Sequence, residues 1–128
     1  MMKNYKEYVE KLLALYDKMC LYADDYSDKK KLKTHNKAVI QSNKLENEIL
    51  KDQDLAEKVF LALMQNESIG VQLSAAACCV YKNGVPALEK MAEETLERIV
   101  KSGVRGCSVM ATRTLGVWRG EIDPDKPW

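Results

Sequence analysis

The feature that most constrains this fold is an almost uninterrupted apolar stretch, residues 70–84 (GVQLSAAACCVYKNG). Up to Val80, only Gln72 and Ser74 carry polar side chains. A helix that is apolar around nearly its whole circumference is buried on most of its surface. The stretch therefore predicts the central helix of a small all-helical domain. We expect this helix to end at Gly84, in the left-handed conformation that closes many helices.

Five further stretches repeat apolar residues at the spacing of an amphipathic helix. Asn4 has the character of an N-cap, Pro86 suits a first helical position, and Gly120 ends the last stretch. In the second stretch, Ile40 and Ile49 are expected on the buried face. The five stretches are residues 5–22, 29–50, 53–64, 86–102 and 104–118.

Short polar links between these stretches predict that consecutive helices pack antiparallel. We expect one all-α domain over residues 1–128, with about six helices stacked as three antiparallel hairpins. Residues 4–51 are expected to form an N-terminal helical pair, and residues 53–120 two further hairpins. Residues 121–128 are expected to form an extended tail, and no stretch alternates as a β-strand does.

A weak internal repeat lies in the second half of the chain. Residues 70–72 (GVQ) are echoed 33 residues later by residues 103–105 (GVR), and each copy opens a helix rich in Ala, Cys and Ser. Stacked helical-hairpin repeats have periods near this length, because one hairpin cannot bury its own apolar face. The repeat predicts a HEAT- or armadillo-like α-α superhelix, with an irregular helical bundle as the alternative.

The same half of the chain resembles a small bacterial family of HEAT-like domains of unknown function. The resemblance covers residues 55–120 and rests on the segments VQLSAAACCVYKNGVPALEKMAE and SVMATRTLGVWRGEI. The Leu-Gly-x-aromatic-Arg-x-Gly ending of that family is matched by Leu115, Gly116, Trp118, Arg119 and Gly120. Here the last glycine follows the arginine directly. The resemblance implies a helical-repeat fold, no catalytic residues, and similarity to small helical immunity proteins encoded beside secreted bacterial toxins.

The overall composition favours no charged partner. Charged residues make up 30% of the 128 residues and the formal net charge is +1, so the chain has no global attraction to nucleic acid or membrane. No apolar run reaches the roughly 18 residues of a membrane span. The N-terminus is charged from Lys3 onward and lacks the apolar segment of a signal peptide. We expect a cytoplasmic protein.

The cysteines indicate neither a metal site nor a catalytic site. Four are present, none in a C-x-x-C pair, and His35 is the single histidine. Two of them, Cys78 and Cys79, lie in the most apolar helix, where a thiol acts as a small hydrophobe and is inert as a nucleophile. The others are Cys20 and Cys107. We therefore expect free thiols in a reducing compartment, no cofactor, no metal and no enzyme activity.

A run of lysines opens the second helix, in residues 29–33 (KKKLK). Such a run suits either a solvated helix face or a patch for nucleic acid. Asp24, Asp25 and Asp28 offset its charge, and no aromatic residue is interleaved. We expect a solvated face, which makes a nucleic-acid partner the weaker alternative.

Two sets of side chains are candidates for contact with a protein partner. The first combines a tryptophan with arginines, residue types over-represented among binding hot spots; it comprises Arg105, Arg113, Trp118 and Arg119. The second is acidic and would suit a partner with a basic site; it comprises Asp24, Asp25, Glu93 and Glu97. The residues leave open which set is used.

Three functions are compatible with these features. The first is an immunity protein that neutralises a cognate bacterial toxin by covering its active site. The second is a scaffolding protein, monomeric or homodimeric, which would associate through exposed Tyr8, Tyr16 and Tyr22. The third is a nucleic-acid-binding helical-repeat protein. We expect the first, a non-catalytic protein-binding module.

Overall fold

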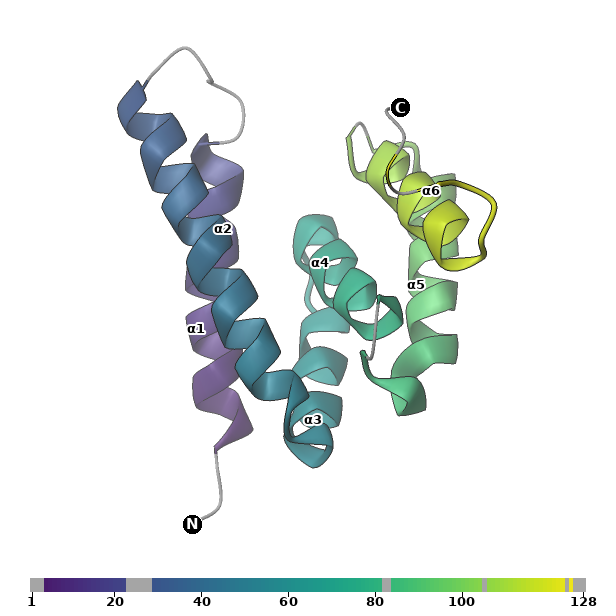
Figure 1. The fold of residues 1–128 in the computed structure, drawn as a ribbon, viewed down its shortest axis with the longest axis horizontal. Coiled ribbons are helices and arrows are strands. Elements are labelled where there is room, and N and C mark those ends of the chain that lie inside the picture. The colour runs from purple at the N-terminus through teal and green to yellow at the C-terminus, as the bar shows by residue number, and fades with distance from the viewer. Residues whose placement is uncertain (1–3, 23–28, 82–83, 105, 124, 126–128) are drawn as a thin grey trace. The chain divides into compact units, whose positions relative to one another are not determined.

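Helices make up most of the chain that the computed structural model describes, which is residues 4–22, 29–81, 84–104, 106–123 and 125. The side chains of residues 17–22 and 31 are outside this description. The described residues form six α-helices and one short 3₁₀ helix, and none of them forms a strand (Figure 1). The elements are α1 (Tyr5–Tyr22), α2 (Lys29–Leu50), α3 (Gln53–Met64), α4 (Ile69–Val80), η1 (Pro86–Leu88), α5 (Glu89–Ser102) and α6 (Cys107–Trp118). The predicted all-α fold with six helices is confirmed.

Local capping groups fix several helix ends. At the start of α1, the Lys6 backbone N–H donates to Asn4 Oδ1 at 3.0 Å. Ser68 caps α4 by accepting from the Val71 N–H at 3.4 Å. Gly103 ends α5 with a φ of 69°, a left-handed conformation that glycine adopts without steric strain. These boundaries follow from signals that are readable in the sequence.

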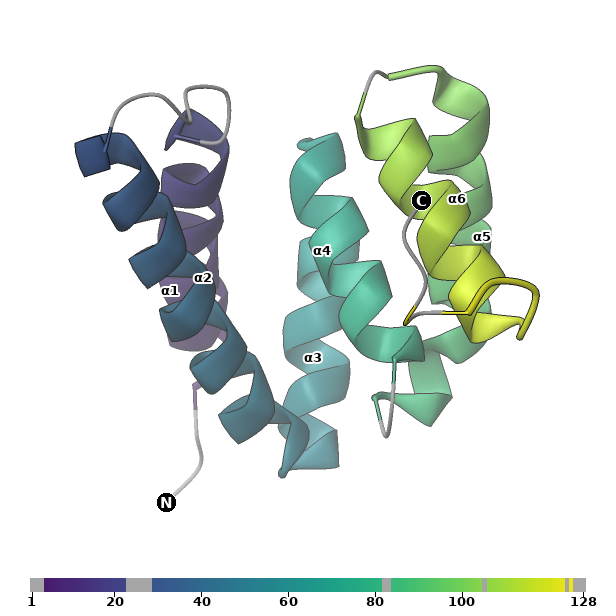
Figure 2. The same cartoon turned by 45° about the horizontal axis from the view of Figure 1, so that its top comes forward.

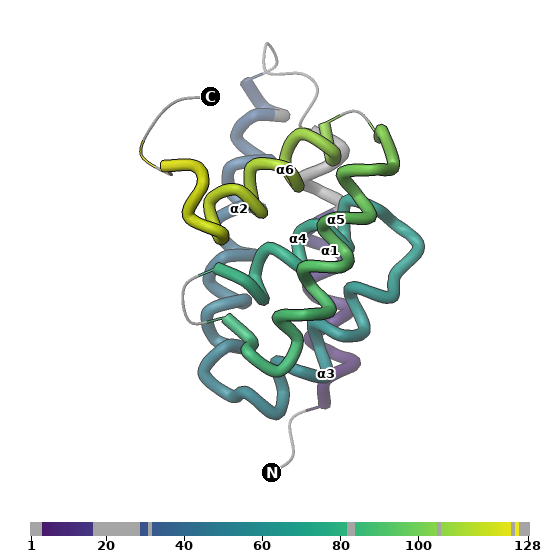
Figure 3. Tube along the Cα trace, turned by 90° about the vertical axis from the view of Figure 1, so that its right-hand side faces the viewer, coloured from purple at the N-terminus to yellow at the C-terminus, as the bar shows by residue number. Residues whose placement is uncertain are grey.

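The helices group into two units, Met1–Ala62 and Leu63–Trp128, so the division falls inside α3. In the first unit, α1 and α2 pack side by side and run antiparallel (Figures 1 and 2). In the second unit, α5 packs against both α4 and α6, and α4 also contacts α6 (Figure 3). Helices α4, α5 and α6 therefore contact one another in pairs.

A buried hydrogen bond joins α1 to α2 in the first unit. The Tyr16 hydroxyl donates to Glu46 Oε2 at 3.2 Å, and the two residues are only 3% and 7% exposed. A buried carboxylate needs such a partner, because its desolvation is otherwise unfavourable. The bond also removes Tyr16 from the exposed face on which a homodimer through α1 would depend. Tyr8 is half-buried, and the side chain of Tyr22 lies outside the described residues.

The buried face of α2 differs from the predicted one at Ile40. Ala38, Ser42 and Ile49 are buried, whereas Ile40 is 68% exposed. Successive helical residues turn by about 100°, so Ile40 lies on the side opposite Ala38 and Ser42. The prediction that Ile40 is buried was wrong, because its hydrophobicity was given more weight than its position around the helix.

Helix α4 is buried, as its composition predicts. Its buried residues are Val71, Ala75, Ala76, Cys79 and Val80. Both α5 and α6 contact α4, and so does η1. Its position against three elements agrees with the expectation that a helix with so few polar side chains is enclosed by its neighbours.

The end of α4 differs from the sequence prediction. The helix ends at Val80, and Tyr81 is already extended, with φ −83° and ψ 141°. Gly84 does not adopt a positive φ. It is buried, and a Cβ there would overlap the backbone carbonyl oxygens of Cys78 and Cys79. Glycine is required at this position because two backbone segments approach closely, and a left-handed turn is not the reason.

We expect Gly84→Ala to destabilise the protein by about 1–3 kcal/mol, the usual effect of forcing an extra carbon into a filled site. Urea denaturation followed by circular dichroism measures the change. Gly103→Asn is the matched control, because Gly103 has open space around it and asparagine tolerates the left-handed conformation. An alanine variant as stable as the wild type would contradict the close approach.

Candidate functional site

Residues 115–120, which are the end of α6 and the turn that follows it, close the C-terminal part of the second unit. Leu115 and Gly116 are buried. Ile122 returns to α6, and its side chain fills the space that a Cβ on Gly116 would need. The backbone N–H groups of Glu121 and Ile122 both donate to the Gly116 carbonyl, at 2.8 and 3.0 Å. Gly120 permits this return with a φ of 76°. Leu115, Gly116 and Gly120 therefore have structural roles.

Arg119 joins the end of α6 to the outer face of α5. Its Nη2 donates to Glu93 Oε2 at 3.1 Å and to Glu97 Oε1 at 2.5 Å. Hydrogen bonds to Glu97, and then to Glu93, raise the pKa of Arg119 above its ordinary value. Because Glu93 and Glu97 are like charges at i and i+4, the guanidinium also relieves their repulsion. The structure brings together three residues that the sequence assigned to two alternative surfaces.

Two of the other predicted contact residues lie on the described part of α6. Arg113 and Trp118 are half-buried on α6. Because Arg113 precedes Arg119 by six residues, about 120° separates the two side chains around the helix. The remaining candidates lie outside the described residues; they are Asp24, Asp25 and Arg105. Contact with a partner stays a prediction for all eight candidates.

The opposite flank of α5 borders a groove of about 360 Å³ within the second unit. Its lining comes from the end of α3, the following turn and the outer side of α5, and comprises Met64, Gln65, Met91, Glu94, Thr95 and Arg98. Met64 is buried at 4% exposure, whereas Met91 is 41% exposed. The groove thus combines a buried thioether with an accessible one.

A polar network holds one wall of the groove in place. Arg98 Nη2 donates to Gln72 Oε1 at 3.0 Å. Gln72 in turn donates through Nε2 to the Asn66 carbonyl at 2.6 Å. These bonds connect α5 to α4 and to the turn before it. The Thr95 hydroxyl donates to the Met91 carbonyl at 2.8 Å, a bond within α5.

The lining combines adaptable apolar side chains with charged ones. Methionine side chains adapt to apolar groups of different shape and are common on binding surfaces. Glu94 and Arg98 add one charge of each sign at the edge. This groove was not predicted from the sequence, because it forms only where α5 and the end of α3 come together. The available signal was that Met91, Glu94 and Arg98 recur at i+3 and i+4 steps.

The thiols that the structure describes are buried or half-buried. Cys79 is 2% exposed, and burial raises its pKa from 9.0 to about 12. Its thiol is therefore protonated at neutral pH, and the thiolate is the nucleophilic form. Cys78 and Cys107 are half-buried, and neither forms a disulfide with another described cysteine. The side chain of Cys20 lies outside the described residues.

In the part of the chain that the structure describes, no three His, Cys, Asp or Glu side chains are grouped so as to hold a metal ion. None of the described helices combines the length and apolar character needed to cross a membrane. No family model, curated protein or solved structure matches the chain.

We expect Cys79 to make stability fall as the pH rises above 9. Folding holds the thiol protonated, whereas the unfolded chain ionises it from its ordinary pKa of 9.0 upward. Since the unfolded state then binds fewer protons, its ionisation favours unfolding between pH 9 and about 12.

Urea denaturation at pH 8 and pH 10.5, under reducing conditions, tests this effect. Cys79→Ala should lose about 2 kcal/mol less stability than the wild type over that interval. Cys107→Ala, which removes a half-buried thiol, is the control and should behave as the wild type. Equal losses in all three proteins would contradict the burial of the Cys79 thiol.

We expect Arg119→Ala to accelerate amide hydrogen exchange in residues 115–122, because the variant loses both carboxylate contacts and leaves Glu93 and Glu97 to repel each other. Exchange followed by mass spectrometry measures this. Arg119→Lys keeps the charge but not the planar fork, so it should restore part of the protection. Unchanged exchange in the alanine variant would show that Arg119 does not hold α6 to α5.

Proposed function

We propose that this chain is a non-catalytic protein-binding module of the immunity type, which neutralises a cognate bacterial toxin by covering its active site. The observation that supports binding most directly is the groove beside α5, with Met91 accessible and Met64 at its base. Exposed apolar side chains bordered by charges are typical of sites that take a partner protein. The groove is proposed as the contact site.

The Arg119 cluster supports this choice of flank. Glu93, Glu97 and Arg119 already satisfy one another, so a partner that used them would first have to break these bonds. Glu94 is not one of the two carboxylates that Arg119 binds. Arg98 is held toward Gln72 by its hydrogen bond. A preformed wall lowers the ordering cost of binding. We therefore propose that the partner contacts Met91, Glu94 and Arg98.

A non-catalytic role is supported by the state of the thiols. The most deeply buried of the described cysteines, Cys79, stays protonated. The hydroxyl of Thr95, which lines the groove, is bonded to the backbone of its own helix. Steric occlusion needs neither an activated nucleophile nor a cofactor. The described cysteines form no disulfide with one another, which suits the cytoplasmic location that we propose.

We also propose that the helices form a HEAT- or armadillo-like series of stacked hairpins. The antiparallel packing of α1 and α2 and the packing of α5 against α6 support it. The two glycines of the internal repeat differ in their backbone roles: Gly70 lies inside α4, whereas Gly103 is the left-handed cap of α5. Support for a repeat therefore comes from helix pairing, and the GVQ and GVR segments add little.

The test begins with the tagged full chain expressed in its native host. Bound proteins are identified by mass spectrometry, and each is expressed in a growth assay with and without the chain. We expect one bound protein to be toxic alone and harmless when the chain is present. A bound protein that is not toxic would contradict the immunity role, and the absence of any bound protein would contradict the binding module.

Variants of α5 then test the groove with the purified partner. Met91→Glu places a charge in the groove and should weaken affinity by about tenfold or more, the usual effect of losing a central apolar contact. Lys90→Gln changes the net charge by the same amount on an exposed position outside the lining, and should change affinity less than about twofold. Equal effects of the two substitutions, measured by titration calorimetry, would place the contact elsewhere.

A further inference from the structure

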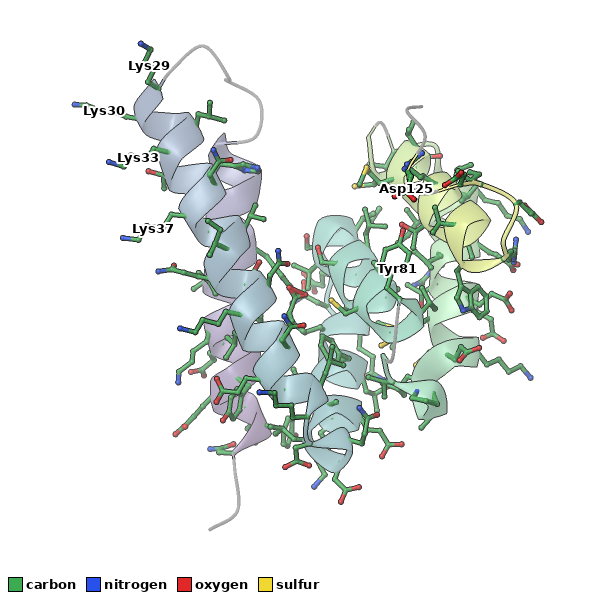
Figure 4. The ribbon with its side chains drawn as sticks, in the orientation of Figure 1. Lys29, Lys30, Lys33, Lys37, Tyr81 and Asp125 are labelled. Atoms are coloured by element: carbon green, nitrogen blue, oxygen red, sulfur yellow. The ribbon has the colours of Figure 1, made fainter. Side chains whose placement is uncertain are left out.

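The outward face of α2 carries an unusual row of side chains, here called the lysine face, which comprises Lys29, Lys33, Lys37, Ile40 and Lys44. All five are exposed. At about 100° per residue they fall within an arc of about 80°, on the side opposite the buried residues of α2. Figure 4 shows Lys29, Lys33 and Lys37 projecting from one side of the helix, with Lys30 beside them.

This arrangement is unfavourable for the helix itself. The first turn of α2 contains lysines and no acidic residue, although the N-terminal end of a helix favours negative charge. Lys29, Lys33 and Lys37 follow one another at i,i+4, the spacing at which like charges repel. No Asp or Glu occurs from residue 29 to residue 45. Residues that disfavour their own helix without a gain for the fold are typical of functional surfaces.

Ile40 distinguishes between the possible anionic partners. It is 68% exposed and lies in the same row, between Lys37 and Lys44. A phosphate backbone presents charge and no apolar group that would cover this side chain. An acidic protein segment provides both the negative charge and the apolar contact, since a row of carboxylates and an apolar residue fit on one helix face. An apolar anchor inside a charged rim is the usual arrangement of a protein interface.

We propose that the lysine face docks an acidic helix of a partner protein, with an apolar side chain of that helix placed against Ile40. Successive lysines are about 6 Å apart along the axis, and carboxylates at i,i+4 on a partner helix have the same spacing. The lysine face lies in the first unit and the groove in the second. This docking surface therefore does not depend on the function proposed for the groove.

The test uses fluorescence anisotropy with two labelled probes of equal negative charge. One is a helical peptide of about 16 residues with Glu at i,i+4 and a single Leu in the Glu row, and the other is a single-stranded DNA oligonucleotide of random sequence with one phosphate for each Glu. We expect the full chain to bind the peptide more tightly than the DNA, with an affinity that falls as salt rises. Tighter binding of the DNA, or no binding of the peptide, would overturn the proposal.

Substitutions on the full chain locate the contact. Lys33→Glu combined with Lys37→Glu should weaken peptide binding by about tenfold or more. Lys58→Glu combined with Lys101→Glu changes the net charge equally at two exposed lysines on other helices, and should change it less than about twofold. Ile40→Ser should weaken binding of the peptide but not of the DNA. Equal effects of the two double variants, or no effect of Ile40→Ser, would contradict the lysine face.

Stability provides a second measurement. Lys33→Glu alone replaces the like-charge pairs with Lys29 and Lys37 by opposite-charge pairs at i,i+4, so this single variant should raise the urea midpoint while it weakens peptide binding. A lower midpoint would show that these lysines serve the fold, and the loss of binding would then reflect damage to α2.

Discussion

Close backbone approach at the end of α4 is the constraint on which the second unit depends. Gly84 lies against the carbonyl oxygens of Cys78 and Cys79, and the Val85 N–H donates to the Cys79 carbonyl at 3.1 Å. The chain enters η1 and α5 directly after this contact. Small side chains on α4 permit its burial, and the position at which α5 begins follows from the contact. The way in which α4 ends therefore determines where α5 begins, and with it the position of both flanks of α5.

The two flanks of α5 differ in their chemistry, and this difference supports the functional proposal. On one flank, Arg119 forms ion pairs with both Glu93 and Glu97 and holds the end of α6. On the other, Met91 and Arg98 line a groove whose polar wall is fixed by Gln72. On the first flank, the charged groups form ion pairs with one another, whereas the second flank leaves apolar surface accessible. A partner gains more by burying the second flank, since apolar burial is the main favourable term in association.

The helices were predictable because their signals are local. Asn4 and Gly103 cap helices through their own backbone neighbourhood, and the composition of α4 required burial whatever its neighbours were. Features that depend on a second helix were not predictable. The burial of Glu46 follows from Tyr16 on another helix, and the link from Arg119 to α5 follows from the fold of the C-terminal turn. The exposure of Ile40 was within reach, because helical geometry alone places it opposite Ala38 and Ser42.

The groove, like the burial of Glu46, was not predictable because it depends on a second helix. It exists only where α5 and the end of α3 come together. Methyl NMR on the full chain with methionine-labelled side chains tests its role most directly. Met110, which is 50% exposed on α6 and outside the groove, is the internal reference. On addition of the bound partner we expect the Met64 and Met91 methyl resonances to shift while that of Met110 stays in place. A shift of Met110 with Met64 and Met91 unchanged would contradict the assignment of this groove as the binding site.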